Sequence, residues 1–270
     1  MERTGHLREV QEAFTRQARS FAASEVARSE QLLDALLDAA RPAPGERWLD
    51  AACGPGIVTR ALAGRAGQAH GIDTTEAMVQ LARDAAQQAG IDNATFAVDD
   101  ATRSGLADAS WDGAVTRFSL HHIPVPARLL DELARVVRPG ARIVVLDHLA
   151  DDDAEARSWV QEVERLRDRS HWASLSPAAM TALGRRAGLT LLEHRDFSFE
   201  LDFDDWLNRG SQDATAHALV EDALQARPQG TERFTVTPGP VGRTLRLRMW
   251  LGTWSRDPGN GARDRRCDDG

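Results

Sequence analysis

The sequence predicts an α/β fold: a doubly wound, mostly parallel sheet of seven strands with helices on both faces. Short apolar segments alternate five times with amphipathic helical segments between residues 46 and 147, which is typical of right-handed strand–helix–strand units. Four of these five apolar segments also run directly into an aspartate. Because ligands bind at the carboxyl ends of parallel strands in such sheets, these acids indicate one shared pocket.

The composition excludes several classes of function. The chain has 270 residues, a formal net charge of −8 and no basic stripe, so nucleic acid is not an expected partner. All 33 basic residues are arginine and there is no tyrosine, which excludes Walker-type phosphate binding and catalysis by lysine or tyrosine. The only cysteines, Cys53 and Cys267, offer neither a disulfide framework nor a cysteine zinc site.

No membrane association is expected. No apolar segment approaches the roughly 20 residues that a membrane span needs, and the segment from Met1 to Thr4 does not open a signal peptide. We therefore expect a cytoplasmic protein, a monomer or a homodimer, whose partner is a small-molecule substrate.

Two helices are expected before the first strand. Apolar residues from Leu7 to Phe21 recur at spacings of three and four, and a second apolar stripe runs from Leu32 to Leu37. Residues 1–44 are expected to form a helical cap that could cover the pocket. In this arrangement Phe21 either contacts the pocket as part of the cap or packs in the core.

The stretch 46–58 predicts a strand, a glycine turn and the start of a helix. The strand ends at Asp50, and Gly54 and Gly56 follow in the turn. Glycines let a ligand approach the backbone, and the N–H groups at the helix start face that ligand. The stretch therefore indicates a nucleotide-type pocket. Dinucleotide binding, the nearest alternative, would favour a third turn glycine where this chain has Thr59.

Two further strand ends are expected at the same pocket. The strand 68–73 ends at Asp73, 19 residues beyond Gly54, near the offset at which a carboxylate meets a ribose in strand–helix–strand units. The strand 94–98 runs into Asp99 and Asp100.

The next two strands bring histidines and another acid to this edge. The strands 111–117 and 141–147 end at Arg117 and Asp147, with a turn at 138–140 before the second. His121 and His122 follow the first of them. A histidine with a pKa near 6.5 suits a general base, and at most one of two adjacent side chains is expected to face a substrate. The alternative is that both pack the loop.

Beyond residue 148 the regular alternation ends. Helices are expected at 156–166 and 176–186, strands at 189–197 and 244–254, and a lid insertion at 203–240 that begins with a helical stretch. Residues 257–270 are expected to form a disordered tail. Six aromatic residues suggest either an apolar cover for the cavity or core packing: Trp159, Trp172, Phe197, Phe199, Phe203 and Trp206.

Together these motifs resemble those of class I S-adenosylmethionine-dependent methyltransferases, in the small-molecule branch similar to the UbiE quinone methyltransferases. The resemblance covers about residues 10–200 and implies a Rossmann-like methyltransferase fold with S-adenosyl-L-methionine as cofactor. The matching segments are Leu49–Gly56, Gly71–Asp73 and Val98–Ala101, and then Arg117–Ile123 and Leu133–Arg142.

The resemblance also implies roles for the first two motifs. Gly54 and Gly56 would let the methionine part of the cofactor lie against the turn, with Asp50 near its amino group. Asp73 would accept hydrogen bonds from both ribose hydroxyls.

The third motif would bind the adenine. Asp100 would accept from the adenine amino group, and Ala101 would offer its backbone N–H. This chain departs from the family pattern where Ala52 and Asp99 replace frequent glycines. Further residues expected to bind the cofactor are Ala52, Thr74 and Arg117.

The resemblance implies methyl transfer to an oxygen, nitrogen or carbon of a small, apolar or aromatic metabolite, in specialised metabolism. Methyl transfer needs alignment, and a base where the acceptor holds a proton. His121 and His122 are the candidate bases, and no metal is expected because no spaced ligand pair recurs. The alternative is a protein that binds the cofactor but catalyses a cyclisation, decarboxylation or hydroxylation.

Overall fold

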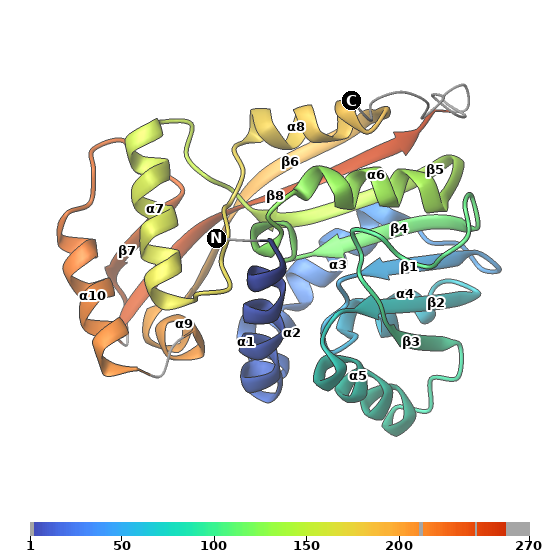
Figure 1. The fold of residues 1–270 in the computed structure, drawn as a ribbon, viewed down its shortest axis with the longest axis horizontal. Coiled ribbons are helices and arrows are strands. Elements are labelled where there is room, and N and C mark those ends of the chain that lie inside the picture. The colour runs from blue at the N-terminus through green and yellow to red at the C-terminus, as the bar shows by residue number, and fades with distance from the viewer. Residues whose placement is uncertain (1–2, 211–212, 241, 258–270) are drawn as a thin grey trace.

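A computed structural model describes residues 3–210, 213–240 and 242–257. Its sheet has the order β3-β2-β1-β4-β5-β8-β6, with the short strand β7 paired to β8 (Figure 1). The first five strands are parallel, and β8 is antiparallel to its three neighbours. The strands are β1 Arg47–Ala51, β2 Gln68–Asp73, β3 Ala94–Val98, β4 Trp111–Arg117, β5 Val137–His148, β6 Leu189–Asp202, β7 Phe234–Pro238 and β8 Arg243–Arg256.

The expected doubly wound sheet of seven strands is confirmed, with β7 as an addition inside the segment expected to form a lid insertion. The helices of the described chain alternate with the strands. They are α1 Arg3–Ala23, α2 Glu25–Arg28, α3 Glu30–Ala40, α4 Ile57–Ala63, α5 Glu76–Gln88, η1 Leu120–His122, α6 Pro126–Val136, α7 Ala154–Arg167, α8 Pro177–Arg186, α9 Phe203–Gly210 and α10 Ala214–Gln225.

The central strands are buried on both faces. Val115 and Val144 belong to one core, which includes residues of α3 and α4, whereas Ala114 and Ile143 belong to a second core with residues of α6. Successive side chains of a strand point to opposite faces, so one continuous apolar segment supplies both cores. Helix α3 was expected to be part of the cap over the pocket, but it packs against one face of the sheet.

Strand β5 begins earlier than the sequence predicts. Its pairing with β4 passes from Val137 directly to Arg142, so the expected turn at 138–140 is an irregularity within the strand. Gly140 has a φ of 82° at this point, a conformation that glycine adopts without a Cβ clash. Residues 258–270, most of the expected tail, lie outside the described residues.

Helix α1 lies between the two ends of the molecule. It contacts α5, beside β2 and β3, and also α9. Figure 1 shows α7, α10 and β7 grouped beyond α9, at the end remote from β3. In the described part of the chain, no helix combines the length and the apolar character needed to span a bilayer.

Candidate active site

The glycine turn after β1 adopts a left-handed backbone. The φ angles of Ala52, Gly54 and Gly56 are 57°, 51° and 71°. A Cβ on Gly54 would come no nearer than 3.9 Å to Phe21 Cε1, whereas a Cβ on Gly56 would lie 2.6 Å from Phe96 Cε1. Gly54 thus leaves open space at the turn, and Gly56 allows the new helix to pack closely on β3. Ala52 holds a conformation that costs a residue with a Cβ roughly 1–2 kcal/mol.

Asp50 lies at the base of this turn. Its side chain is 1% exposed, and Thr59 Oγ1 donates a hydrogen bond to Oδ2 at 2.6 Å. Burial raises the pKa of Asp50 to about 7, although Thr59 and Arg117 both favour the charged form. Thr59 stands where a dinucleotide motif would have its third glycine, and it is fully buried beneath the turn. A ligand cation beside Asp50 would restore its charge.

Asp73, at the end of β2, holds the turn in place. Its Oδ2 accepts from Gly54 N at 2.9 Å, and its Oδ1 accepts from Thr75 N at 2.8 Å. Burial raises the pKa of Asp73, and these backbone hydrogen bonds oppose the rise. One carboxylate therefore joins the turn after β1 to the start of α5.

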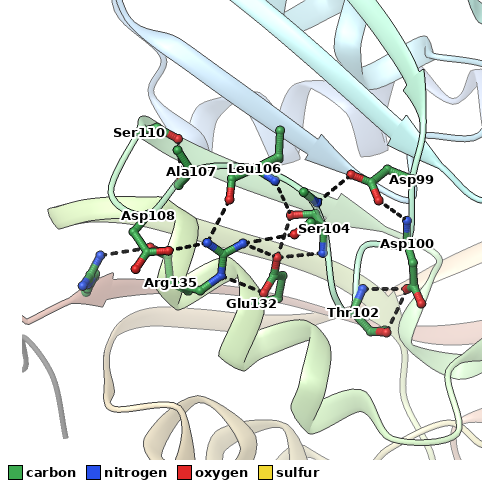
Figure 2. A network of polar contacts seen from close by, with 12 residues as sticks. Asp99, Asp100, Thr102, Ser104, Leu106, Ala107, Asp108, Ser110, Glu132 and Arg135 are labelled. Atoms are coloured by element: carbon green, nitrogen blue, oxygen red, sulfur yellow. Dashed lines mark hydrogen bonds and ion pairs between the residues drawn. The ribbon is translucent and has the colours of Figure 1, made fainter. Parts of the chain in front are cut away.

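The loop after β3 separates the roles of two neighbouring acids (Figure 2). Asp99 accepts from Asp100 N at 2.8 Å and from Gly105 N at 3.0 Å, so both of its oxygens hold the loop. Asp100 Oδ1 accepts from Thr102 N and Oγ1, both at 2.8 Å. Within the described chain, Asp100 Oδ2 makes no hydrogen bond and remains available for a ligand.

Helix α6 anchors the other half of this loop. Glu132 Oε1 accepts from Ser104 N at 2.8 Å and from Ser104 Oγ at 2.6 Å. Arg135 bonds Glu132, the Leu106 carbonyl and Asp108 (Figure 2). The loop carrying Asp100 is therefore held at both ends before any ligand binds.

The strand ends and α1 enclose a cavity of about 240 Å³, here called the main cavity. Among the residues expected to bind cofactor, Gly56 alone does not line it. Of the two histidine candidates, His122 lines it and His121 does not. The lining includes Asp50, Ala52, Gly54, Asp73, Thr74, Asp100, Ala101, Arg117, His122 and, from α1, His6, Leu7, Val10, Phe14 and Phe21.

Three polar side chains tie α1 to the rest of the fold. His6 Nε2 lies 2.9 Å from the His122 carbonyl, and Gln11 Nε2 donates to the Thr74 carbonyl at 2.9 Å. Gln17 Nε2 donates to the Gly210 carbonyl of α9 at 2.8 Å. These three residues are polar and do not belong to the apolar stripe, so the sequence alone does not distinguish them from solvent-facing side chains.

A smaller cavity of about 50 Å³, here called the histidine chamber, adjoins the main cavity. It is lined by His121, His122 and His148. It shares His122 and three aromatic residues with the main cavity: Phe14, Phe21 and Phe118. Of the six aromatic residues expected at a cavity or in the core, Trp206 alone lines it.

His121 and Asp147 form a buried pair in this chamber. His121 Nδ1 lies 2.5 Å from Asp147 Oδ1, and Asp147 Oδ2 accepts from Ser119 N and Leu120 N. Burial alone would lower the pKa of His121, but Asp147 raises it above the ordinary value. The pKa of Asp147, which burial alone would raise, falls to about 2 because of His121.

Three further histidines surround His121. Its ring centroid lies 4.2 Å from that of His122, 4.6 Å from His148 and 5.6 Å from His171. Burial, followed by the positive charge of His121, lowers the pKa of His122 and of His148 to about 3 and that of His171 well below its ordinary value. The cluster therefore concentrates its positive charge on His121.

The same cluster brings three potential metal ligands together. Within the described residues, ligand atoms of His121, Asp147 and His148 all lie within 4.8 Å of one another. The rings of His121 and His148, however, stack with an interplanar angle of 8°. An ion must lie close to the plane of each imidazole that binds it, and two stacked planes do not meet, so this arrangement does not fit a shared metal.

Arg117 is a buried cation in the wall of the main cavity. Its Nη2 donates to the Ala27 carbonyl at 2.9 Å, and its buried Nη1 has no hydrogen-bond partner in the described chain. Burial lowers the pKa of Arg117 to about 10, whereas Asp50 raises it. The carboxylate of Asp50 and the guanidinium of Arg117 thus face the same cavity, and Nη1 of Arg117 remains an unpartnered donor within the described chain.

Comparisons with known proteins identify related chains. A family model described as a methyltransferase domain matches residues 16–194. The uncharacterised methyltransferase YcgJ of Bacillus subtilis is 25% identical over 233 residues, covering 86% of this chain and 92% of YcgJ. A demethylmenaquinone methyltransferase of Clavibacter sepedonicus is 38% identical over 109 residues, covering 40% of this chain and 44% of that one.

Solved structures share the fold. The crystal structure of Bacillus subtilis YcgJ matches with a TM-score of 0.80 at 24% identity, covering 85% of this chain and 99% of that chain. The [4+2]-cyclase SpnF matches with a TM-score of 0.63 at 20% identity, covering 85% of this chain and 81% of that chain.

Proposed function

Because the chain belongs to the class I S-adenosylmethionine-dependent methyltransferases, we propose that it methylates a small molecule held in the histidine chamber, with His121 as the general base. This proposal is carried by Nε2 of His121, which lines the histidine chamber and has no hydrogen-bond partner among the described residues. S-adenosylmethionine supplies an electrophilic methyl group when bound. Residues of the main cavity bind the cofactor, and residues of the histidine chamber orient the acceptor and remove its proton.

The main cavity fits the zwitterionic end of the cofactor. Asp50 would pair with the ammonium group, and the free Nη1 of Arg117 would bond the carboxylate. Burial moves the pKa values of both residues towards neutralisation, to about 7 and about 10. A bound zwitterion would favour the charged form of each. Gly54 gives this end of the ligand access to the backbone, because no Cβ occupies the space.

The next two strand ends would hold the nucleoside. Asp73 would accept from the ribose hydroxyls with the lone pairs that remain beside its bonds to Gly54 N and Thr75 N. Asp100 Oδ2 would accept from the adenine amino group, and Ala101 lines the cavity beside it. The fixed loop after β3 supports this role, since a preorganised acceptor loses little entropy on binding.

His121 is suited to take a proton from the acceptor. If Nδ1 donates to Asp147, the neutral ring presents the lone pair of Nε2, which makes no hydrogen bond in the described chain. His121 lines the chamber, and the imidazolium formed by proton transfer remains next to a carboxylate. Asp147 is a positioning residue, since it fixes the tautomer and stabilises the charge.

His122 is the weaker of the two candidates. Its pKa of about 3 makes it a poor proton acceptor at neutral pH. Its Nδ1 lies 2.9 Å from the Ser170 carbonyl, and its own carbonyl faces His6 Nε2. These contacts support a packing role in which His122 separates the main cavity from the loop after α7.

Transfer of labelled methyl groups tests the proposal. The protein is incubated with S-adenosylmethionine carrying a tritiated methyl group and a panel of phenols, amines and carboxylic acids, and products are separated by chromatography. We expect a labelled product with the wild-type chain and loss of that product with Asp73→Asn. Stabilisation by S-adenosylhomocysteine without any labelled product would instead favour a non-methylating cofactor-binding protein.

A further inference from the structure

A polar groove opens on the far side of the histidine chamber. This outer groove, of about 740 Å³, lies between α1, the end of α7, the end of α9 and the start of α10. It shares Gln17, Arg167, Asp168 and Arg209 with the histidine chamber. The chamber in turn shares residues with the main cavity. The three spaces therefore lie next to one another, in the order outer groove, histidine chamber and main cavity.

Arginines dominate the wall of the outer groove. Arg16, Arg165 and Arg169 are exposed, and none has a carboxylate partner among the residues that the structure describes. The acids of the groove have other partners: Glu9 contacts His6, Glu12 contacts Arg8, Asp168 bonds Ser170 and contacts the groove residue Arg167, and Asp213 caps α10. The groove is thus lined by five arginines and four acids, on a chain whose net charge is −8.

Buried donors without acceptors lie where the groove meets the chamber. Arg209 uses Nε to bond Asp205 at 2.9 Å, but its buried Nη2 has no hydrogen-bond partner in the described chain. Trp206 Nε1 is likewise buried and unpartnered. Buried donors cost free energy when they are left without an acceptor. A ligand oxygen could accept hydrogen bonds from both of them.

The guanidinium of Arg167 lies beside these two donors. Arg167 stacks over the Trp206 ring with its Cζ 4.6 Å from the centroid, and Nη1 donates to the Trp206 carbonyl. Burial and the charge of Arg167 both lower the pKa of Arg209. Both guanidinium groups already have carboxylate partners, Arg167 in Glu164 and Asp168 and Arg209 in Asp205. The preference for a ligand oxygen therefore rests on the two unpartnered donors, Arg209 Nη2 and Trp206 Nε1.

The chamber beyond these donors is largely apolar. Phe14, Phe21, Val26, Phe118, Leu201 and Leu247 complete its wall. We propose that the substrate is a small amphipathic acid: its carboxylate or phosphate binds Arg209, Arg167 and Trp206 Nε1, and its apolar part extends past His121 towards the methyl group. This inference rests on the proposed function, because it takes the chamber to be the acceptor site.

Matched probes test the charge requirement directly. Phenylacetate, phenyl phosphate and uncharged 2-phenylethanol are titrated into protein saturated with S-adenosylhomocysteine, and binding is followed by ligand-observed NMR. We expect at least one of the acids to bind roughly tenfold more tightly than the alcohol, which corresponds to one charge-assisted hydrogen bond. The acid that binds more tightly shows whether a carboxylate or a phosphate is the preferred group.

Variants assign the preference to the groove. Arg209→Gln is expected to remove most of the difference between acid and alcohol, and Arg209→Lys to restore part of it. Arg246→Gln is the matched control, since Arg246 pairs with exposed Glu200 on the sheet, away from the groove. Equal binding of acids and alcohol to the wild type, or an unchanged preference in Arg209→Gln, would overturn the proposal.

The methyl-transfer assay keeps the two proposals separate. Methylation of neutral compounds, with no preference for acids, would overturn the inference about the substrate but not the proposed function. An acid preference that depends on Arg209, in a protein that transfers no methyl group to any acid, would support the anion site and overturn the proposed function.

Discussion

The imidazole of His121 lies 2.5 Å from the carboxylate of Asp147, although 26 residues separate them in the chain. His121 follows β4 in the short helix η1, and Asp147 stands near the end of β5. Because β4 and β5 are parallel neighbours, their carboxyl ends meet at one edge of the sheet. This pairing distinguishes His121 from the other three histidines of the cluster. A hydrogen bond from Nδ1 to Asp147 leaves Nε2 as the nitrogen that can take a proton.

Replacing His121 tests the base. His121→Gln is expected to lower kcat by roughly 10²–10⁴-fold, the usual contribution of general base catalysis. Binding of S-adenosylhomocysteine should stay unchanged, because His121 does not line the main cavity. Steady-state kinetics and calorimetry provide the two measurements. His194→Gln, at an exposed position on β6, is the control. An undiminished kcat in His121→Gln would show that His121 is not the general base.

The pH dependence of kcat tests the pairing with Asp147. A general base acts in its neutral form, so kcat should rise with pH through the raised pKa of His121, which lies above the ordinary value of 6.5. In Asp147→Asn the attracting charge is lost and burial dominates, so the rising limb should move to lower pH. The maximal kcat should also fall, because the tautomer is no longer fixed. A rising limb at the same pH in both proteins would contradict the pairing.

Asp99 and Asp100 should respond differently to the same substitution. Asp100→Asn is expected to weaken S-adenosylhomocysteine binding by roughly tenfold, the effect of one hydrogen bond to a ligand, with little change in Tm. Asp99→Asn should chiefly lower Tm, because both oxygens of Asp99 hold the loop. Calorimetric titration and thermal unfolding measure the two effects. The opposite assignment of the effects would show that Asp99 faces the ligand.

The two turn glycines form another matched pair. In Gly56→Ala the new Cβ would lie 2.6 Å from Phe96 Cε1, and such overpacking typically costs about 1–3 kcal/mol of unfolding free energy. Gly54→Ala has space for its Cβ, so its main effect should be weaker cofactor binding at a narrowed cavity. Chemical denaturation and cofactor titration separate these outcomes. Equal stability loss in both variants would show that backbone φ alone sets the cost.

Local patterns were sufficient to predict the sheet and the strand-end residues that line the main cavity. Apolar segments such as 141–147 encode strands buried on both faces, and the strand ends carry Asp50, Asp73 and Asp100 to one edge. Parallel pairing brings these ends together, so position along the chain predicts position in space. The prediction placed Gly56 with Gly54, because spacing alone does not tell which glycine meets a ligand and which meets a helix.

The sequence by itself therefore determined the fold class, the cofactor family and the edge of the sheet where the cofactor site is expected. Tertiary structure decided which of His121 and His122 pairs with Asp147, how Gln11 and Gln17 tie α1 to Thr74 and to α9, and that Arg209 borders the histidine chamber. The physical reason is that backbone periodicity is local, whereas burial, hydrogen bonding and pKa depend on side chains that only the complete packing brings together.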